Sequence, residues 1–191
     1  MPTAFRRPEP MTIEAFDAFV EAQADDRAFE LVEGEIVMMT NRTEAHEQIA
    51  GNIGAPLKLA MDARGCRTYQ GGMRVQRSHD ARGTDKTKPD VVVRCGPAGT
   101  NTYIIDPLVI VEVLSPSTMD VDRGPKLDFY KSLPTVRHIA LVYQEQMRVE
   151  HYRRIEEGWD REILTTAEAL LEFEAVEFRI ALERIYFDVA L

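Results

Sequence analysis

The chain has 191 residues, of which 45% are hydrophobic and 29% are charged, a composition typical of one globular domain with a sizeable core. Its formal net charge of -9 excludes a protein that coats nucleic acid through overall positive charge, but it allows an enzyme with a local basic rim. No stretch reaches the roughly 18 apolar residues that a membrane-spanning helix needs, so we expect no association with a membrane.

Two cysteines, Cys66 and Cys95, are present, and their number and spacing predict neither a disulfide framework nor a CxxC-type metal site. Residues 1–11 contain three prolines and no apolar segment of the kind found in secretion signals. We therefore expect a flexible tail over residues 1–11, a single domain over residues 12–191 and a cytoplasmic location.

Hydrophobic spacing, capping residues and turn residues divide the first half of the chain into short elements. The expected elements are a helix over 12–23 capped by Thr12, a hairpin over 29–39 that turns at Glu33-Gly34, a helix over 44–63 capped by Thr43, two strands at 67–70 and 73–77 joined around Gly71-Gly72, and a polar, basic loop over 78–88.

In the second half, apolar runs alternate with one helical segment. The expected elements are strands at 90–94 and 107–114, a helix over roughly 122–132, a strand over 136–143, a hairpin that joins 147–153 to 159–164, a strand near 176–180 and a short helix near 181–186. Helices that alternate with strands in this order favour an α/β fold with a mixed sheet flanked by helices.

Two acidic residues stand out in the apolar strands. Glu112 lies in the middle of the run 108–114, which is otherwise apolar, and Asp90 opens the run 90–94. An ionised carboxylate in a buried strand costs several kcal/mol unless a cation, a metal ion or hydrogen-bond donors compensate it. If the two strands are neighbours, both carboxylates and the backbone carbonyl of Val113 can hold one Mg²⁺ ion. The alternative is that Glu112 forms an ion pair with a core arginine such as Arg74, while Asp90 only shapes a turn.

Further side chains could complete such a site. Lys126 follows Glu112 on the next helix, where an ammonium could stabilise phosphate charge; its other interpretation is an exposed lysine paired with Asp122. Tyr130 lies one turn later on the same face and could hydrogen-bond near the site, but a partly buried packing tyrosine is the favoured interpretation. The remaining candidates are His46 and Glu47 at the start of the 44–63 helix and Glu30 and Glu35 in the first hairpin, for all of which a surface position is the ordinary alternative.

The region between residues 64 and 88 is the basic part of this acidic chain, with seven lysines and arginines. Such a region could form a rim that contacts phosphate groups. An ordinary solvated loop is an equally good interpretation.

Several segments resemble motifs of the Uma2 family, and the resemblance covers roughly residues 11–188. Residues 30–35 (ELVEGE) resemble its YELIDGE opening, 89–93 resemble its PDVVV, 111–118 resemble its VEVLSPST, and 122–126 with Tyr130 resemble its D-x-G-x-K-x-x-x-Y. The octet at 111–118 is the most specific of these.

The resemblance implies a PD-(D/E)xK, restriction-endonuclease-like fold. This fold has an αβββαβ core, to which the N-terminal helix and hairpin and a C-terminal β-hairpin would be additions. It also implies that Asp90 and Glu112 bind the metal ion and that His46 faces it from the first core helix. The sequence departs from the superfamily motif because Leu114 stands where the motif lysine is expected, so Lys126 would supply the cation instead.

The leading hypothesis is thus a Mg²⁺-dependent nuclease, active also with Mn²⁺, in which Asp90, Glu112, Lys126 and His46 are the catalytic residues and DNA is the expected substrate. A second hypothesis is a nuclease-fold module that binds nucleic acid or a protein without cleaving. A third is a purely structural role for Glu112 in a core ion pair. A homodimer is expected if both strands of a duplex are cut.

Overall fold

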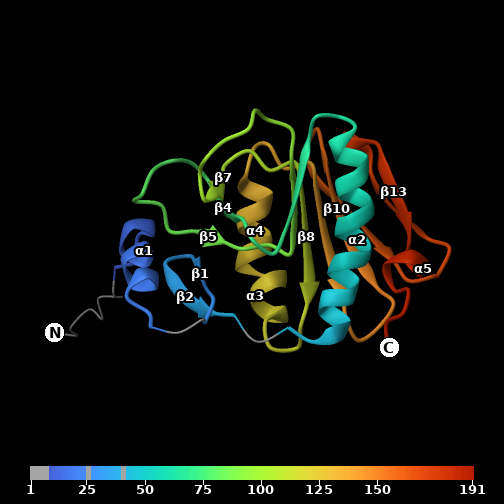
Figure 1. Cartoon of the computed structure of the whole chain (residues 1–191), viewed down its shortest axis with the longest axis horizontal. Coiled ribbons are helices and arrows are strands. Elements are labelled where there is room, and N and C mark those ends of the chain that lie inside the picture. The colour runs from blue at the N-terminus through green and yellow to red at the C-terminus, as the bar shows by residue number, and fades with distance from the viewer. Residues whose placement is uncertain (1–8, 25–26, 40–41) are drawn as a thin grey trace.

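The computed structural model describes residues 9–24, 27–39 and 42–191, which form an α/β fold around a six-stranded mixed sheet (Figure 1). The strand order is β11-β10-β9-β8-β6-β3; β8 and β9 are parallel, and the other neighbours are antiparallel. The strands are β3 (Arg67–Gln70), β6 (Val91–Arg94), β8 (Val109–Leu114), β9 (His138–Tyr143), β10 (Val149–Ile155) and β11 (Gly158–Leu164). All positions of β8 and β9 are buried, as their apolar runs predict for strands covered on both faces.

Helices cover both faces of this sheet (Figure 1). One face packs against α2 (Glu44–Asp62) through a cluster that includes Ile49, Ile53 and Leu57. The other face packs against α3 (Met119–Arg123) and α4 (Pro125–Ser132), where Leu127 and Tyr130 are buried. The order α2, β3, β6, β8, α3–α4, β9 is the predicted αβββαβ core, so the expected fold class is confirmed.

The helix expected over 122–132 is two helices that meet at Gly124. This residue has φ -105° and ψ -109°, outside the helical region, and Pro125 begins α4. The residue before a proline is disfavoured in the helical conformation, and proline suits the first position of a helix, so this pair separates α3 from α4. Asp122 of α3 and Lys126 of α4, on the two sides of the break, contact each other at 2.8 Å.

A second sheet of five strands lies beside the first, at the N-terminal end of the molecule (Figure 1). Its order is β2-β1-β5-β4-β7, and helix α1 packs on it. These elements are α1 (Ile13–Glu21), β1 (Phe29–Val32), β2 (Glu35–Met38), β4 (Arg74–Gln76), β5 (Lys86–Thr87) and β7 (Tyr103–Ile104). The predicted hairpin turn at Glu33-Gly34 is correct, with positive φ at both residues.

The strands at 67–70 and 73–77 do not pair with each other. β3 pairs with β6 in the first sheet, whereas β4 pairs with β5 and β7 in the second. Gly71, with φ +59°, lies in the segment where the chain leaves one sheet for the other. The predicted loop over 78–88 likewise contains β5, whose two residues are buried. Spacing predicted these strands, but not their partners.

The C-terminal part forms the predicted β10–β11 hairpin and a small two-stranded sheet. That sheet pairs β12 (Leu170–Phe173) with β13 (Phe178–Ala181), and α5 (Leu182–Ile185) follows it. β12 and β7 were not expected from the sequence. Both strands are short, so residue patterns give little sign of them. β12 is recognised as a strand because all four of its residues pair with β13.

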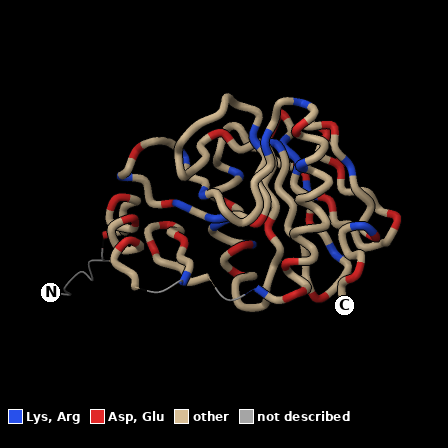
Figure 2. Tube along the Cα trace, viewed as in Figure 1, with Lys and Arg blue, Asp and Glu red and all other residues tan. Residues whose placement is uncertain are grey.

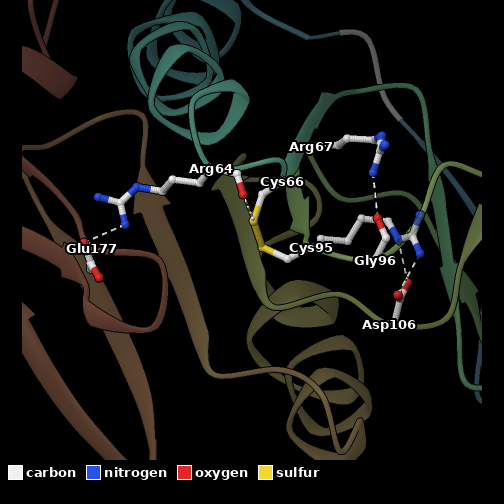
Figure 3. The surroundings of a disulfide bond; sticks show 8 residues. Arg64, Cys66, Arg67, Cys95, Gly96, Asp106 and Glu177 are labelled. Atoms are coloured by element: carbon white, nitrogen blue, oxygen red, sulfur yellow. Dashed lines mark hydrogen bonds and ion pairs between the residues drawn. A yellow bond between two sulfur atoms is a disulfide. The ribbon is translucent and has the colours of Figure 1, made fainter.

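The two cysteines form a disulfide bond, which corrects the expectation drawn from their spacing (Figure 3). Arg67 of β3 lies opposite Arg94 of β6, so Cys66 and Cys95 occupy the next position of the same antiparallel ladder. Nearby polar contacts are the Arg67 hydrogen bond to the Gly96 carbonyl at 2.6 Å and the Arg94–Asp106 ion pair at 2.7 Å. Sheet register, which spacing along the chain does not reveal, brings the thiols together.

Most of the expected flexible tail, residues 1–8, lies outside the described residues. Met11 belongs to the fold, because its N–H donates to the Gly34 carbonyl at 3.0 Å. Within the described ranges, none of the helices combines the length and the apolar character that crossing a membrane requires.

Candidate active site

The predicted site residues gather at the C-terminal end of β8, where the start of α2 and helix α3 also converge (Figure 1). Val91 of β6 lies opposite Val111 of β8, so Asp90, one residue before β6, is level with Glu112. These elements and β1 of the second sheet enclose one polar pocket. Its charged lining residues are Glu30, Arg42, His46, Asp90, Glu112, Asp122 and Lys126.

Asp90 is 4% exposed, and three donors hold its carboxylate. Its Oδ1 accepts a hydrogen bond from Arg42 at 2.6 Å and lies 3.0 Å from His46 Nε2, while its Oδ2 accepts from the Val113 N–H at 2.7 Å. Burial raises the pKa of Asp90, but the His46 hydrogen bond and charge and the Arg42 charge outweigh it and lower the pKa below its ordinary value. Asp90 is therefore an ionised carboxylate.

Glu112 is 3% exposed and has fewer compensating groups. Its Oε1 accepts a hydrogen bond from the Tyr130 hydroxyl at 2.6 Å and lies 2.9 Å from Lys126 Nζ. Burial raises the pKa of Glu112 well above its ordinary value, and the neighbouring charges of Asp122, Asp90 and Glu30 add to the rise against the opposing charge of Lys126. The ammonium of Lys126 therefore offsets only part of the cost of burying Glu112 among other acids.

Lys126 is 2% exposed, and its ammonium contacts carboxylates from three different elements. Its Nζ lies 2.8 Å from Asp122 in α3, 2.9 Å from Glu112 in β8 and 3.1 Å from Glu30 in β1. Burial lowers the pKa of Lys126, but these acids outweigh burial and raise the pKa well above its ordinary value. The pair with Asp122 that the sequence suggested is present, but inside the cluster and not on the surface.

The charge of the pocket fits a divalent cation. Four buried carboxyl groups, from Glu30, Asp90, Glu112 and Asp122, gather in the pocket beside the guanidinium of Arg42, the imidazole of His46 and the ammonium of Lys126. Mg²⁺ takes oxygen ligands and is often held by one or two carboxylates together with waters and substrate phosphate. Among the described residues, no group of three or more acidic, histidine or cysteine side chains is arranged to hold a metal ion. The donor chemistry fits Mg²⁺ held by two carboxylates, not an all-protein cage.

Three of the predicted lining residues lie apart from this cluster. Glu35 is exposed at the start of β2, and Arg74 donates to the Phe29 carbonyl at 2.7 Å. Glu47 is exposed and joins the site only through its ion pair with Arg42 at 3.1 Å. The alternative ion pair between Glu112 and Arg74 is therefore not formed, because Lys126 is the cation beside Glu112.

Several cations of the expected basic rim over residues 64–88 have partners within the protein. Lys86 pairs with Asp17 at 2.7 Å, and Arg82 pairs with Asp80 at 3.0 Å. Arg77 donates to the Ser132 hydroxyl at 2.6 Å. Lys86 and Arg77 thus join this segment to α1 and α4, whereas Arg82, whose side chain is 85% exposed, pairs with its neighbour Asp80 at the surface.

Sequence reasoning missed Arg42 as a site residue and treated Asp122 only as a partner for a surface lysine. Arg42 directly precedes the helix-capping Thr43, and Asp122 begins the family motif that contains Lys126. The available signal for Arg42 and Asp122 was their position next to residues that the sequence had already singled out. Neither lies inside an apolar run of the kind that pointed to Glu112.

Comparisons with known proteins agree with this architecture. Residues 13–183 match the family model of Uma2, described as "Putative restriction endonuclease". Two uncharacterized proteins of Synechocystis are similar: sll1609, 30% identical over 162 residues (83% of this chain and 87% of that protein), and slr1290, 28% identical over 164 residues (84% of each). The crystal structure of a protein from Anabaena variabilis, described as "a putative nuclease belonging to DUF820", has the same fold, with a TM-score of 0.73 and 18% identity over 93% of this chain and 98% of that one. The match over most of its length shows that the chain belongs to the Uma2 family.

Proposed function

We propose that this protein is a Mg²⁺-dependent endonuclease that hydrolyses phosphodiester bonds in nucleic acid, with DNA as the preferred substrate. The observation that carries the proposal is the position of Asp90 and Glu112, two buried acids level with each other on adjacent strands, in a pocket where four buried carboxyl groups gather. Membership of a family described as restriction endonucleases and the nuclease-like fold support the same class of reaction.

In this proposal Asp90 and Glu112 hold the ion. When bound, Mg²⁺ supplies Lewis acidity toward the phosphate and lowers the pKa of a coordinated water. Arg42, His46 and the Val113 N–H fix the Asp90 carboxylate, so its orientation is set before substrate arrives. Tyr130 orients Glu112 in the same way from the opposite side.

Lys126 has two tasks in this scheme. Its ammonium keeps Glu30, Glu112 and Asp122 from repelling one another, and it adds positive charge where the reacting phosphate gains negative charge. Because Lys126 comes from α4 and not from the strand of Glu112, the cation reaches the site from above the sheet face. Mn²⁺, which also takes oxygen ligands, is expected to substitute for Mg²⁺.

A nuclease-fold module that binds without cleavage is the second candidate. The observation in its favour is that Lys126 Nζ already lies between three of the carboxylates, so the protein itself supplies one cation there. A homodimer with two sites would suit cleavage of both strands of a duplex, and this assembly belongs to the proposal.

The test combines a cleavage assay with calorimetric titration of Mg²⁺ and Mn²⁺. Single- and double-stranded DNA and RNA are incubated with wild type, Asp90→Asn, Glu112→Gln and the control Glu35→Gln, which removes an exposed acid from the neighbouring hairpin. We expect metal-dependent cleavage by wild type and the control, a loss of at least about 100-fold in the two site variants, and weaker metal binding in both. Cleavage retained by Asp90→Asn and Glu112→Gln would refute the assignment, and metal binding without any cleavage would favour the second candidate.

A further inference from the structure

A second buried carboxylate, Glu150, lies in the same row of the sheet as Glu112. Leu141 of β9 is the register partner of Glu112 on one side and of Glu150 on the other. Register partners on neighbouring strands face the same side of a sheet, and strands are about 4.8 Å apart, so the two glutamates are on one face with Cα atoms about 10 Å apart. Glu150 therefore lies beside the candidate active site, two strands away.

Glu150 is 0% exposed, yet its surroundings are rich in donors. Tyr143 and Tyr152 donate their hydroxyls to its two oxygens, at 2.7 and 3.0 Å. Burial raises the pKa of Glu150, but these hydrogen bonds and the adjacent arginine charges lower the pKa below its ordinary value. Glu150 is an ionised acid that tyrosines already satisfy.

Three arginines nevertheless converge on this one carboxylate. Arg123 of α3, Arg148 beside β10 and Arg161 of β11 lie 3.3, 3.2 and 3.1 Å from the Glu150 oxygens. Their side chains are 42%, 30% and 42% exposed, so each guanidinium reaches the acid from the solvent side. One negative charge holds three positive ones, which leaves two in excess and most of the N–H donors available to another acceptor.

One further cation and one further acid lie next to this group. Lys131 Nζ lies 4.2 Å from the centre of the Tyr152 ring, close to Arg161, and Asp128 is an exposed acid near Lys131. Counted together, four cations face the two acids Glu150 and Asp128. Figure 2 shows basic and acidic residues distributed over the described chain, and the net charge of the protein is -9, so this local excess of positive charge is opposite in sign to the net charge.

The arginine group is also physically joined to the candidate active site. Arg123 directly follows Asp122, whose carboxylate contacts Lys126 at 2.8 Å. Consecutive residues of α3 thus reach the acidic pocket and the Glu150 cluster. An anionic polymer that presents one phosphate to the pocket would present its next phosphates, a few nucleotides away, to these arginines.

We propose that Arg123, Arg148 and Arg161 form a phosphate-binding platform that holds the nucleic-acid backbone beside the site of hydrolysis. Guanidinium groups bind phosphate oxygens with two parallel hydrogen bonds, and contacts of this kind position nucleic acid without reading its sequence. Glu150 is the positioning residue, because it fixes the three side chains before the substrate arrives. The platform rests on the proposed function for the identity of its ligand, but it can be tested without cleavage.

The experiment measures binding of fluorescein-labelled single- and double-stranded DNA by anisotropy, in EDTA so that no cleavage occurs, over a series of salt concentrations. The variants are Arg123→Gln, Arg148→Gln and Arg161→Gln, each of which leaves two arginines on Glu150. The matched control is Arg153→Gln, which removes an arginine of similar exposure, 45%, from the same hairpin, where it pairs with Glu174 and Asp160. Arg161→Lys, which keeps the charge, tests for rescue.

We expect each platform variant to bind DNA roughly 3- to 10-fold more weakly and to lower the slope of log affinity against log salt by about 0.7 to 0.9. The control should change affinity less than about twofold, and Arg161→Lys should keep the wild-type salt slope. Wild-type binding that the three variants leave unchanged would overturn the platform while leaving the proposed function intact. Absence of any nucleic-acid binding by wild type in EDTA would overturn the platform, while the cleavage assay with Mg²⁺ would still decide the proposed function. Platform-dependent binding without cleavage in that assay would support the platform alone.

Discussion

At the scale of single residues, Lys126 links parts of the molecule that are far apart in sequence. Its three carboxylate partners come from β1, β8 and α3, so one buried ammonium joins the second sheet, the first sheet and the helix between them. Removing one partner of a buried ion pair is strongly destabilising, because the remaining charges lose their compensation.

We therefore expect Lys126→Gln to lower the free energy of unfolding by about 3–5 kcal/mol in the absence of divalent metal. Mg²⁺ should restore part of this loss, since it compensates the same carboxylates. Denaturant unfolding with and without Mg²⁺ measures both effects. The control is Lys58→Gln, which breaks an exposed ion pair with Asp62 in α2 and should cost less than about 1 kcal/mol. Equal losses in the two variants would contradict a buried, shared lysine.

The raised pKa of Glu112 leads to a second prediction at this scale. A carboxyl group must lose its proton to bind Mg²⁺, so metal affinity should increase as the pH rises through the raised pKa of Glu112. In the metal-free protein, folding stability depends on pH in the opposite direction. The contribution of Glu112 to stability is greatest below its unfolded-state pKa and is lost as the pH rises through its folded-state pKa. Calorimetry in buffers of different ionisation enthalpy should detect proton release on metal binding by wild type and not by Glu112→Gln. Equal proton release by both proteins would assign the shift to another group.

At the scale of elements, a pair of buried histidines couples β9 and β10. His138 Nδ1 lies 3.1 Å from His151 Nε2, and His138 Nε2 accepts the Ala175 N–H, which makes His138 Nδ1 the donor within the pair. Burial lowers the pKa of each histidine to about 4. Both are therefore neutral at pH 7, and charging either one breaks this arrangement.

A lowered folded-state pKa gives stability that is present above the unfolded-state pKa of about 6.5 and is lost as the pH falls toward 4. The shift corresponds to about 3 kcal/mol for each histidine. We expect thermal stability to fall steeply between pH 6.5 and 4, and to fall less in His151→Gln, which cannot take up a proton. The control His79→Gln, at an exposed position, should keep the wild-type pH dependence. A wild-type slope in His151→Gln would show that other groups govern acid unfolding.

Elements defined by local chemistry were predictable, whereas their pairing was not. The caps Thr12 and Thr43 accept hydrogen bonds from Ala15 and His46, where the sequence placed the helix starts. The separation of β3 and β4 into two sheets depends on hydrogen bonds to β6 and β5, which are distant in sequence. Local residue patterns carry information about helix ends and turns, but the partner of a short strand is fixed by tertiary contacts.

The same distinction holds for the site at the scale of the whole molecule. Asp90 and Glu112 could be recognised because a charge inside an apolar strand requires an explanation. Glu30 is in a strand whose four positions are all buried, and it contacts Lys126 only because the second sheet packs against the first. The second sheet therefore contributes Glu30 to the candidate active site through the packing of one sheet against the other, which residue patterns along the chain do not reveal.

The disulfide gives a last prediction, which concerns stability without function. Cys66 and Cys95 are separated by 29 residues, and closing a loop of this length stabilises the folded state by about 3.5 kcal/mol in the chain-entropy account. Cys95 follows β6 at its C-terminal end, whereas Asp90 precedes β6 at the other end, so the disulfide and the site are at opposite ends of the strand.

We expect the double variant Cys66→Ser/Cys95→Ser to unfold at a lower temperature than wild type while it keeps whatever cleavage activity and metal affinity wild type has in the assays of the proposed function. Wild type in dithiothreitol should unfold like the double variant, which separates loss of the disulfide from loss of the thiols. Thermal unfolding and the cleavage assay at a temperature well below both midpoints measure the two properties. A loss of activity at that temperature in the double variant would contradict this prediction. It would mean that the disulfide at the C-terminal end of β6 also affects the position of Asp90 at the other end of the strand.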